Sequence, residues 1–122
     1  LPWVPGVDLS GVVVGAGGDS DFGVGDEVFA MVDLRRGGAY ADYAIVREEE
    51  AARRPRGLRD VEAASLPLVA LTAWKALFEA GGLDRGQRVL IHGGAGGVGT
   101  AAIQLAKWRG ATVWTTASAG NH

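Results

Sequence analysis

The glycine-rich segment from Ile91 to Gly99 has the residue types and the spacing to bind phosphate groups. It contains Gly94-x-Gly96-x-x-Gly99 directly after an apolar run, Arg88 to His92. Two of these glycines allow the backbone to turn tightly and approach a pyrophosphate, and the third allows a helix to pack closely against a strand. The N–H groups and the positive dipole end of that helix would face the phosphates. We predict that the following residues bind the pyrophosphate of a dinucleotide: Gly94, Ala95, Gly96, Gly97, Val98 and Gly99.

The elements that must position this turn are also visible in the sequence. A helix is expected from Val98 to Arg109, ended by Gly110, and a second apolar run follows from Thr112 to Ala117. Strand, glycine turn, helix and strand form the first βαβ unit of a dinucleotide-binding fold. The alternative is an ordinary tight turn, because the chain has 20 glycines. The flanking elements in the required order favour the binding turn.

Composition excludes several other kinds of chemistry. There is no cysteine, which removes disulfides, thiolate nucleophiles and sulfur-bound zinc, and only His92 and His122 could supply imidazole. His92 is expected to support the turn rather than to act as a base. The net charge of −2 argues against a nucleic-acid partner. No apolar stretch is expected to span a bilayer, and no basic-then-apolar leader is seen, so we predict a cytoplasmic protein that does not bind membranes.

The first half of the chain has the pattern of a β-domain. Strands are expected within Val7 to Ala16, Val28 to Val32 and Ala39 to Val46, separated by glycine-containing turns. Short strands of this kind are typical of a barrel-like domain. The charged run from Glu48 to Arg59 is interpreted as a solvated connection.

Two helices are expected between the β-domain and the glycine turn. Asp60 is a candidate N-cap for a short helix that runs through Ala64. Pro67 can open a longer helix, from Leu68 to Ala80, which a pair of glycines would end. The surface turn after it contains Gly86, which we take as a position for a neutral control substitution unless its φ is positive.

Five sequence blocks, in this order, resemble the medium-chain dehydrogenase/reductase superfamily. Within that superfamily they are most similar to the zinc-free, quinone oxidoreductase-like branch. The blocks are Pro5 to Gly11, Val24 to Val28, Gly38 to Tyr43, Ala63 to Pro67 with Leu71 to Ala73, and Val89 to Lys107.

The resemblance implies an α/β architecture in which the cofactor lies between two domains. Residues 1–59 correspond to part of a GroES-like β-barrel catalytic domain, residues 60–82 to connecting helices, and residues 83–122 to the N-terminal part of a Rossmann domain. By that template the chain is incomplete, because it starts within the barrel and stops after the second Rossmann strand. The complete protein is expected to be a homodimer.

The resemblance also implies hydride transfer from NADPH to a quinone or an α,β-unsaturated carbonyl. The catalytic residues are expected outside this segment, so none is named, and the isolated segment should be inactive. Thr72 corresponds to a threonine that lies near the cofactor in the family, although it could equally pack in the hinge. Asp8 and Asp26 are expected to hold turns, and catalysis by Tyr40 or Tyr43 is the weaker interpretation.

The cofactor preference is inferred from the end of the second strand. An NAD enzyme usually has an acidic residue there, and here the position is Ala117 or Ser118. We predict NADP(H), with Ser118 donating a hydrogen bond to the 2′-phosphate and Asn121 assisting. No metal is expected, because Gly6-Val7-Asp8 stands where the zinc-dependent branch has Gly-His-Glu.

Three alternatives remain open at this stage. One is a non-catalytic, crystallin-like NADPH-binding protein, and another is a folding or interaction module. The third is an enoyl reductase of the polyketide-synthase type, which is weakened because Asn121 occupies the position of a lysine typical of that group.

Overall fold

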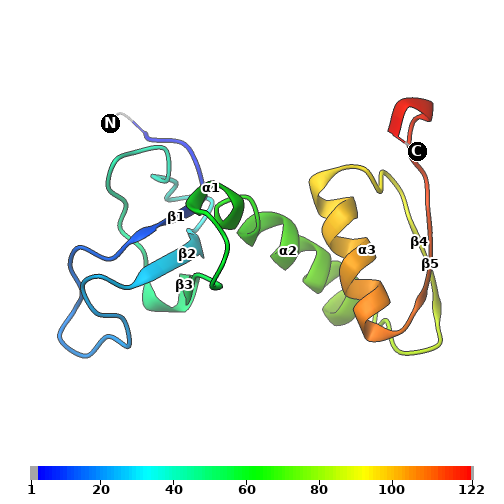
Figure 1. The fold of residues 1–122 in the computed structure, drawn as a ribbon, viewed down its shortest axis with the longest axis horizontal. Helices are drawn as coiled ribbons and strands as arrows, with labels where there is room; N and C mark the ends of the chain where they lie inside the picture. Colours follow the sequence, from blue (N-terminus) through cyan, green and yellow to red (C-terminus); the bar gives the residue numbers. More distant parts are fainter. Residues whose placement is uncertain (1–2, 122) are drawn as a thin grey trace. The chain divides into compact units, whose positions relative to one another are not determined.

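The chain forms two units in the computed structural model, which describes residues 3–121. They are Leu1–Leu68 and Val69–His122, and the boundary between them falls inside a helix. The domain boundaries expected from the sequence stay predictions. Figure 1 shows the elements of each unit, which we describe in turn.

The first unit contains a three-stranded antiparallel sheet with strand order β1-β2-β3. The strands are β1 (Asp8–Val12), β2 (Glu27–Met31) and β3 (Ala51–Arg53). Phe29 in the central strand is opposite Ser10 on one side and Ala52 on the other. The buried apolar residues of this unit are few and mostly small: Val28, Ala30, Val32 and Ala63. The strands expected within Val7 to Ala16 and from Val28 to Val32 are confirmed: β1 is shorter than expected, and β2 begins and ends one residue earlier.

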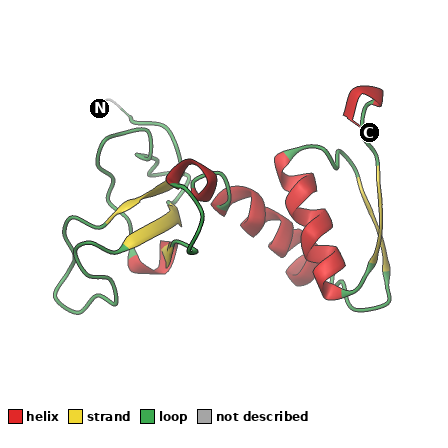
Figure 2. Ribbon diagram, in the orientation of Figure 1, coloured by secondary structure: helices red, strands yellow, loops and turns green. Residues whose placement is uncertain are grey.

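The strand expected from Ala39 to Val46 is wrong. The N–H groups of Ala39 and Tyr40 donate to the carbonyls of Gly6 and Pro5, at 3.1 and 3.0 Å, and no ladder continues beyond them within residues 3–121. The side chains of Tyr40 and Tyr43 are 75% and 77% exposed. Alternation of apolar residues is therefore not sufficient, since a strand also needs a neighbouring strand to receive its hydrogen bonds. Figure 2 shows this segment as loop.

The charged run from Glu48 to Arg59 is mostly exposed, as expected, but part of it is regular structure rather than a simple connection. It begins with the 3-10 turn η1 (Glu48–Glu50) and continues into β3. The Glu50 carboxylate accepts the N–H groups of Arg47 at 2.9 Å and Asp33 at 3.1 Å, and it pairs with the Arg36 guanidinium. Burial acts to raise the pKa of Glu50, but these hydrogen bonds together hold it below its ordinary value.

The short helix α1 (Asp60–Ala63) begins one residue earlier than expected. Its N-cap is Arg59, so Asp60 is the first helical residue and the N-cap prediction for it is wrong. Glu62 then lies at the third helical position, where its carboxylate accepts the Arg59 N–H at 2.9 Å. The Asp60 carboxylate instead lies 3.0 Å from the Arg54 guanidinium.

The longer helix is α2 (Pro67–Trp74), and it continues as the π-helical segment η2 (Lys75–Ala80). The helix ends at Ala80, just before the pair of glycines, as expected, and Gly82 in that pair has a φ of +57°. By length and composition alone, the 21-residue run Asp60–Ala80 could cross a bilayer, because an 18-residue window within it has a mean hydropathy of 1.3. The expectation that no apolar stretch could span a bilayer is therefore wrong on these two criteria. The run is interrupted at residues 64–66. Two of its residues, Ala73 and Leu77, belong to a buried core inside the second unit.

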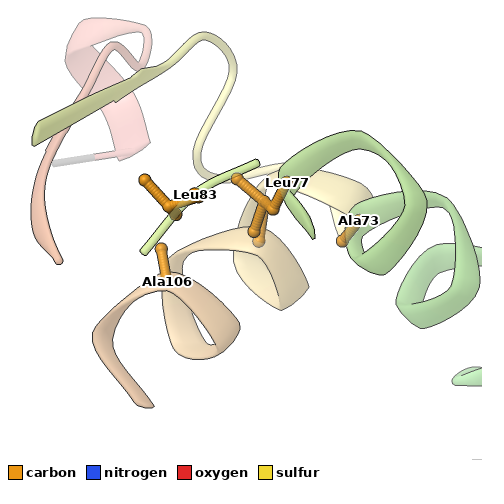
Figure 3. Close-up of a cluster of buried hydrophobic side chains, with 5 residues drawn as sticks. Ala73, Leu77, Leu83 and Ala106 are labelled. Atoms are coloured by element: carbon orange, nitrogen blue, oxygen red, sulfur yellow. The ribbon is translucent and has the colours of Figure 1, made fainter. Parts of the chain in front are cut away.

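The second unit is a βαβ unit, as the sequence predicts. Strands β4 (Arg88–Ile91) and β5 (Thr112–Thr115) are parallel, and helix α3 (Gly97–Arg109) connects them and packs against them. Gly110, with φ of +87°, caps α3, and a last 3-10 turn, η3 (Ala119–Asn121), follows β5. Figure 3 shows the core of this unit, in which two leucines pack with three alanines: Ala73, Leu77, Leu83, Ala102 and Ala106.

Candidate functional site

The glycine turn connects the end of β4 to the start of α3. The chain reverses at Gly93, whose φ of +67° lies in the left-handed region that favours glycine. The Gly96 N–H then donates to the Gly93 carbonyl at 3.0 Å, and Gly96 is the N-cap of α3. The positive φ therefore falls on Gly93, one residue before the three motif glycines.

Two of the motif glycines are needed because other atoms lie where a side chain would be. A Cβ at Gly94 would overlap Thr115 Oγ1 and would lie 3.0 Å from Ile103 Cδ1. A Cβ at Gly99 would overlap the Gly93 carbonyl oxygen and lie 2.8 Å from Gly94 Cα. Gly94 and Gly99 are both buried. The close approach expected of the third glycine is therefore present, although its nearest neighbour is the turn itself.

The N-terminus of α3 presents hydrogen-bond donors that the protein does not use. Within residues 3–121, no acceptor is found for the backbone N–H groups of Ala95, Gly97, Val98 and Gly99, whereas the Thr100 N–H reaches the Gly96 carbonyl at 2.8 Å. The first turn of any helix leaves such groups unpaired, and the helix dipole adds positive potential there. No acidic residue lies in the first turn of α3 to neutralise it. The arrangement is chemically suited to an anion such as a phosphate group.

Two threonines that sequence reasoning missed hold this turn in place. The Thr115 hydroxyl donates to the Ile91 carbonyl at 2.8 Å, and the Thr116 carbonyl accepts the Gly94 N–H at 2.9 Å. The available signal was the Thr-Thr pair at the end of β5. Because β4 and β5 are parallel and Thr115 is opposite Ile91, these two threonines lie beside the end of β4, where the turn begins.

The structure places Thr72 on the helix that lies beside the N-terminus of α3. The Val69 Cγ1 atom of α2 would be 3.1 Å from a Cβ at Gly97. Thr72 is exposed and comes three residues later, so it shares a helix face with Val69. A role for Thr72 in binding a cofactor stays a prediction.

Ser118 follows the end of β5 by three residues and is exposed. Its hydroxyl oxygen accepts a hydrogen bond from the Asn121 amide nitrogen at 2.8 Å, and its carbonyl accepts the Asn121 N–H at the same distance. The hydroxyl hydrogen of Ser118 is then still available to donate. The two residues that were expected to act together are therefore in contact with each other.

The expectation that the two motif carboxylates hold turns is confirmed for Asp26 but not for Asp8, which lies in β1 and bonds to the start of helix α2. Asp8 accepts the Leu68 N–H at 2.9 Å, close to the start of α2, and burial raises the pKa of its carboxyl despite this hydrogen bond. Asp26 accepts the Gly23 N–H at 2.8 Å. The hydrogen bond from Arg53, together with that of Gly23, lowers the pKa of Asp26.

The imidazoles and acidic side chains do not gather into a metal centre in the described part of the chain. Among residues 3–121, no three His, Asp or Glu side chains lie close enough together to hold an ion. His92 is exposed, and its Nδ1 atom lies 3.2 Å from Thr116 Oγ1. His122 lies outside the described residues.

Comparison with known proteins identifies relatives along the whole chain. Residues 1–56 match the family model of the alcohol dehydrogenase GroES-like domain. The zebrafish (Danio rerio) protein called NAD(P)H oxidoreductase RTN4IP1, mitochondrial, is 43% identical over 97% of this chain, which covers 32% of that protein. This chain thus spans about a third of the length of that relative. A relative from Arthroderma benhamiae, 40% identical over 88% of this chain and covered to 35% of its own length, is called a probable zinc-binding oxidoreductase.

Solved structures also match this chain along nearly its whole length. The quinone oxidoreductase of Coxiella burnetii is 43% identical, with a TM-score of 0.89, and 100% of this chain matches 39% of that one. The CurK enoyl reductase is 34% identical, also with a TM-score of 0.89, and 97% of this chain matches 35% of that chain.

Proposed function

Because the chain belongs to the medium-chain dehydrogenase/reductase superfamily, we propose that it is part of an NADPH-dependent reductase of quinones or α,β-unsaturated carbonyls. Its relatives include NAD(P)H oxidoreductases, a quinone oxidoreductase and an enoyl reductase. In this proposal residues 83–122 are the first part of a Rossmann domain that binds the cofactor.

The observation that carries the proposal is the set of unused donors at the N-terminus of α3. Within residues 3–121, four backbone N–H groups of this segment have no acceptor, and the glycines of the turn carry no side chain that could block a ligand. A dinucleotide pyrophosphate has the oxygen acceptors and the negative charge that such a turn favours. The binding residues would be those predicted from the motif, from Gly94 to Gly99, together with Thr72 and Ser118.

The bound nicotinamide would supply the hydride, and the protein would supply position and electrostatics. The residues of this chain would act on the phosphate half of the cofactor, where they orient it without touching the reacting carbon. We assign no catalytic residue within this chain. The isolated segment is therefore expected to give no turnover, because binding without the reacting geometry gives little rate.

We propose NADPH rather than NADH as the reductant. The end of β5 carries Ser118 and Asn121 and has no acidic side chain that would repel a 2′-phosphate. Titration of the full-length protein with both reduced cofactors tests this preference, and equal or tighter binding of NADH would refute it.

We propose that the protein works without catalytic zinc. Val7 offers no ligand atom, and the neighbouring Asp8 carboxylate is already bonded to the Leu68 N–H. The Arthroderma relative carries a zinc-binding name, so metal content needs a direct test. Stoichiometric zinc that survives dialysis and is required for activity would overturn this part of the proposal.

An enoyl reductase is a second candidate, favoured by the structural similarity to the CurK enzyme. A non-catalytic NADPH-binding protein is a third, and the glycine turn is compatible with all of them. Oxidation of NADPH by a quinone or a simple enone supports the first candidate, and oxidation by an enoyl thioester alone supports the second, each measured with the full-length protein. NADPH binding without any of these reactions supports the third.

The quaternary structure and the location of the protein are also proposals. We propose a homodimer, to be tested by light scattering of the full-length protein. A cytoplasmic location stays a proposal, and the zebrafish relative is described as mitochondrial. Subcellular fractionation distinguishes the two compartments.

A further inference from the structure

We propose that Thr116 is a positioning residue for the glycine turn and that it acts through its contact with His92. This inference rests on the proposed function, because the turn that Thr116 holds is the one assigned to the cofactor. Three consecutive residues of the turn are held by Thr116. Its hydroxyl oxygen accepts the Gly93 N–H at 3.3 Å and lies 3.2 Å from His92 Nδ1, and its carbonyl accepts the Gly94 N–H at 2.9 Å.

The hydroxyl group of Thr116 can form a hydrogen bond with the Gly93 N–H and with His92 Nδ1 at the same time. A hydroxyl has one hydrogen to donate and two lone pairs to accept with. It accepts from the Gly93 N–H and donates to His92 Nδ1 when that nitrogen carries no proton. The contact therefore ties the imidazole ring to the residue at which the chain reverses. A valine in the same place would keep the shape of the side chain and lose both hydrogen bonds.

The position of Gly93 and Gly94 determines where the unused donors point. The Gly93 carbonyl accepts the Gly96 N–H at 3.0 Å, and the Gly94 carbonyl accepts the Thr100 hydroxyl at 3.2 Å. Both bonds connect the turn to the first residues of α3. A shift at Gly93 is therefore transmitted to the backbone N–H groups that would face a phosphate.

We expect the contact between Thr116 and His92 to affect the orientation of the glycine turn more than the free energy of folding. His92 and Thr116 are both exposed, so water can satisfy whichever polar group loses its partner. The backbone bonds from the Thr116 carbonyl and N–H, the latter to the Ile91 carbonyl at 3.2 Å, remain in any side-chain variant. Loss of a hydrogen bond of ordinary strength corresponds to a change of about three- to tenfold in an equilibrium constant.

The test compares three variants of the full-length protein by titration with NADPH. Thr116→Val is expected to raise the Kd for NADPH by about three- to tenfold, and Thr116→Ser, which keeps the hydroxyl, should bind nearly as the parent does. Thr112→Val is the matched control, because Thr112 is an exposed residue at the opposite end of β5, paired with Arg88. A role in stability alone would lower the thermal midpoint and leave the Kd of the folded protein unchanged.

A double-variant cycle tests the coupling to His92. His92→Phe keeps a ring and removes Nδ1, so it should weaken binding alone but add little to Thr116→Val. Additive effects would refute the coupling. Parental affinity in Thr116→Val, or equal losses in Thr116→Val and Thr116→Ser, would refute the positioning role. If the parent protein binds neither NADPH nor NADH, the proposed function itself is wrong, which is a different outcome from these.

Discussion

Replacement of Gly99 by alanine is the sharpest test of the glycine turn as a binding site. The new Cβ would overlap the Gly93 carbonyl oxygen and lie 2.8 Å from Gly94 Cα, whereas ordinary contacts begin at 3.4 Å. Helix α3 and the turn would have to separate by more than about 0.6 Å, the difference between those two distances. Both neighbours are backbone atoms, so no side chain can rotate away to relieve the overlap.

The expected effect of Gly99→Ala is larger on binding than on folding. Overpacking of this kind costs about 1–3 kcal/mol, which exceeds the gain of up to about 1 kcal/mol from replacing glycine by alanine within a helix. If that cost of about 1–3 kcal/mol falls on the conformation of the turn that binds the cofactor, it corresponds to a rise of about 5- to 150-fold in the Kd. We therefore expect a Kd for NADPH raised within this range in the full-length protein, with a lower thermal midpoint and an unchanged circular dichroism spectrum.

The control is Gly18→Ala, which makes the same chemical change in the first unit. Gly18 has no positive φ, and no atom outside its chain neighbours lies within 4 Å of an added Cβ. Gly86, the position considered first, is unsuitable because its φ is +79°. If Gly99→Ala binds NADPH as tightly as Gly18→Ala does, and melts at the same temperature, the assignment of this turn to the phosphates is refuted.

Three further predictions concern individual carboxylates and the end of β5. Ser118→Asp should weaken NADPH binding more than tenfold and improve NADH binding, since a carboxylate repels the 2′-phosphate and accepts from a 2′-hydroxyl; a parallel change in both affinities would contradict it. The pKa of Asp26 is lowered in the folded state by Arg53, so its contribution to stability is present at neutral pH and disappears as the pH falls below about 4. Asp26→Asn should therefore lower the thermal midpoint at pH 7 and change it little at pH 2.5, and an equal loss at both would exclude this explanation. Burial raises the pKa of Asp8, so ionisation of this carboxyl lowers the stability of the folded protein as the pH rises. Asp8→Asn keeps an acceptor for the Leu68 N–H and stays neutral, so its effect on the thermal midpoint should become less harmful as the pH rises from 3 to 7.

The second unit was predicted well because its signals are local. A glycine motif between an apolar run and an amphipathic helix requires strand, turn and helix within one short segment, and Gly110 ends that helix by its own backbone freedom. The first unit was predicted less well. The segment from Ala39 to Val46 has the alternation of a strand, yet among residues 3–121 its backbone N–H groups find acceptors only at Gly6 and Pro5.

The charged segment shows that composition, too, is not sufficient to predict structure. Composition favours solvent for Glu48 to Arg59, but Glu50 is surrounded by Arg36 and the backbone of two loops, and Ala51–Arg53 pairs with β2. Of the neighbours of Glu50, Arg47 is only three residues away, but Arg36 and Asp33 are 14 and 17 residues away, so no local pattern could indicate those two. The same is true of Thr116, which reaches the turn only because β5 lies parallel to β4.

By itself, the sequence determined where the glycine turn lies, which elements flank it, and which residues have no side chain to obstruct a phosphate. The tertiary structure decided which glycine reverses the chain, which atoms enforce the others, and which side chains hold the turn. The physical reason is that backbone freedom and helix capping are properties of neighbours in sequence, whereas a clash at Gly99 or a hydrogen bond from Gly93 to Thr116 exists only once separate segments meet.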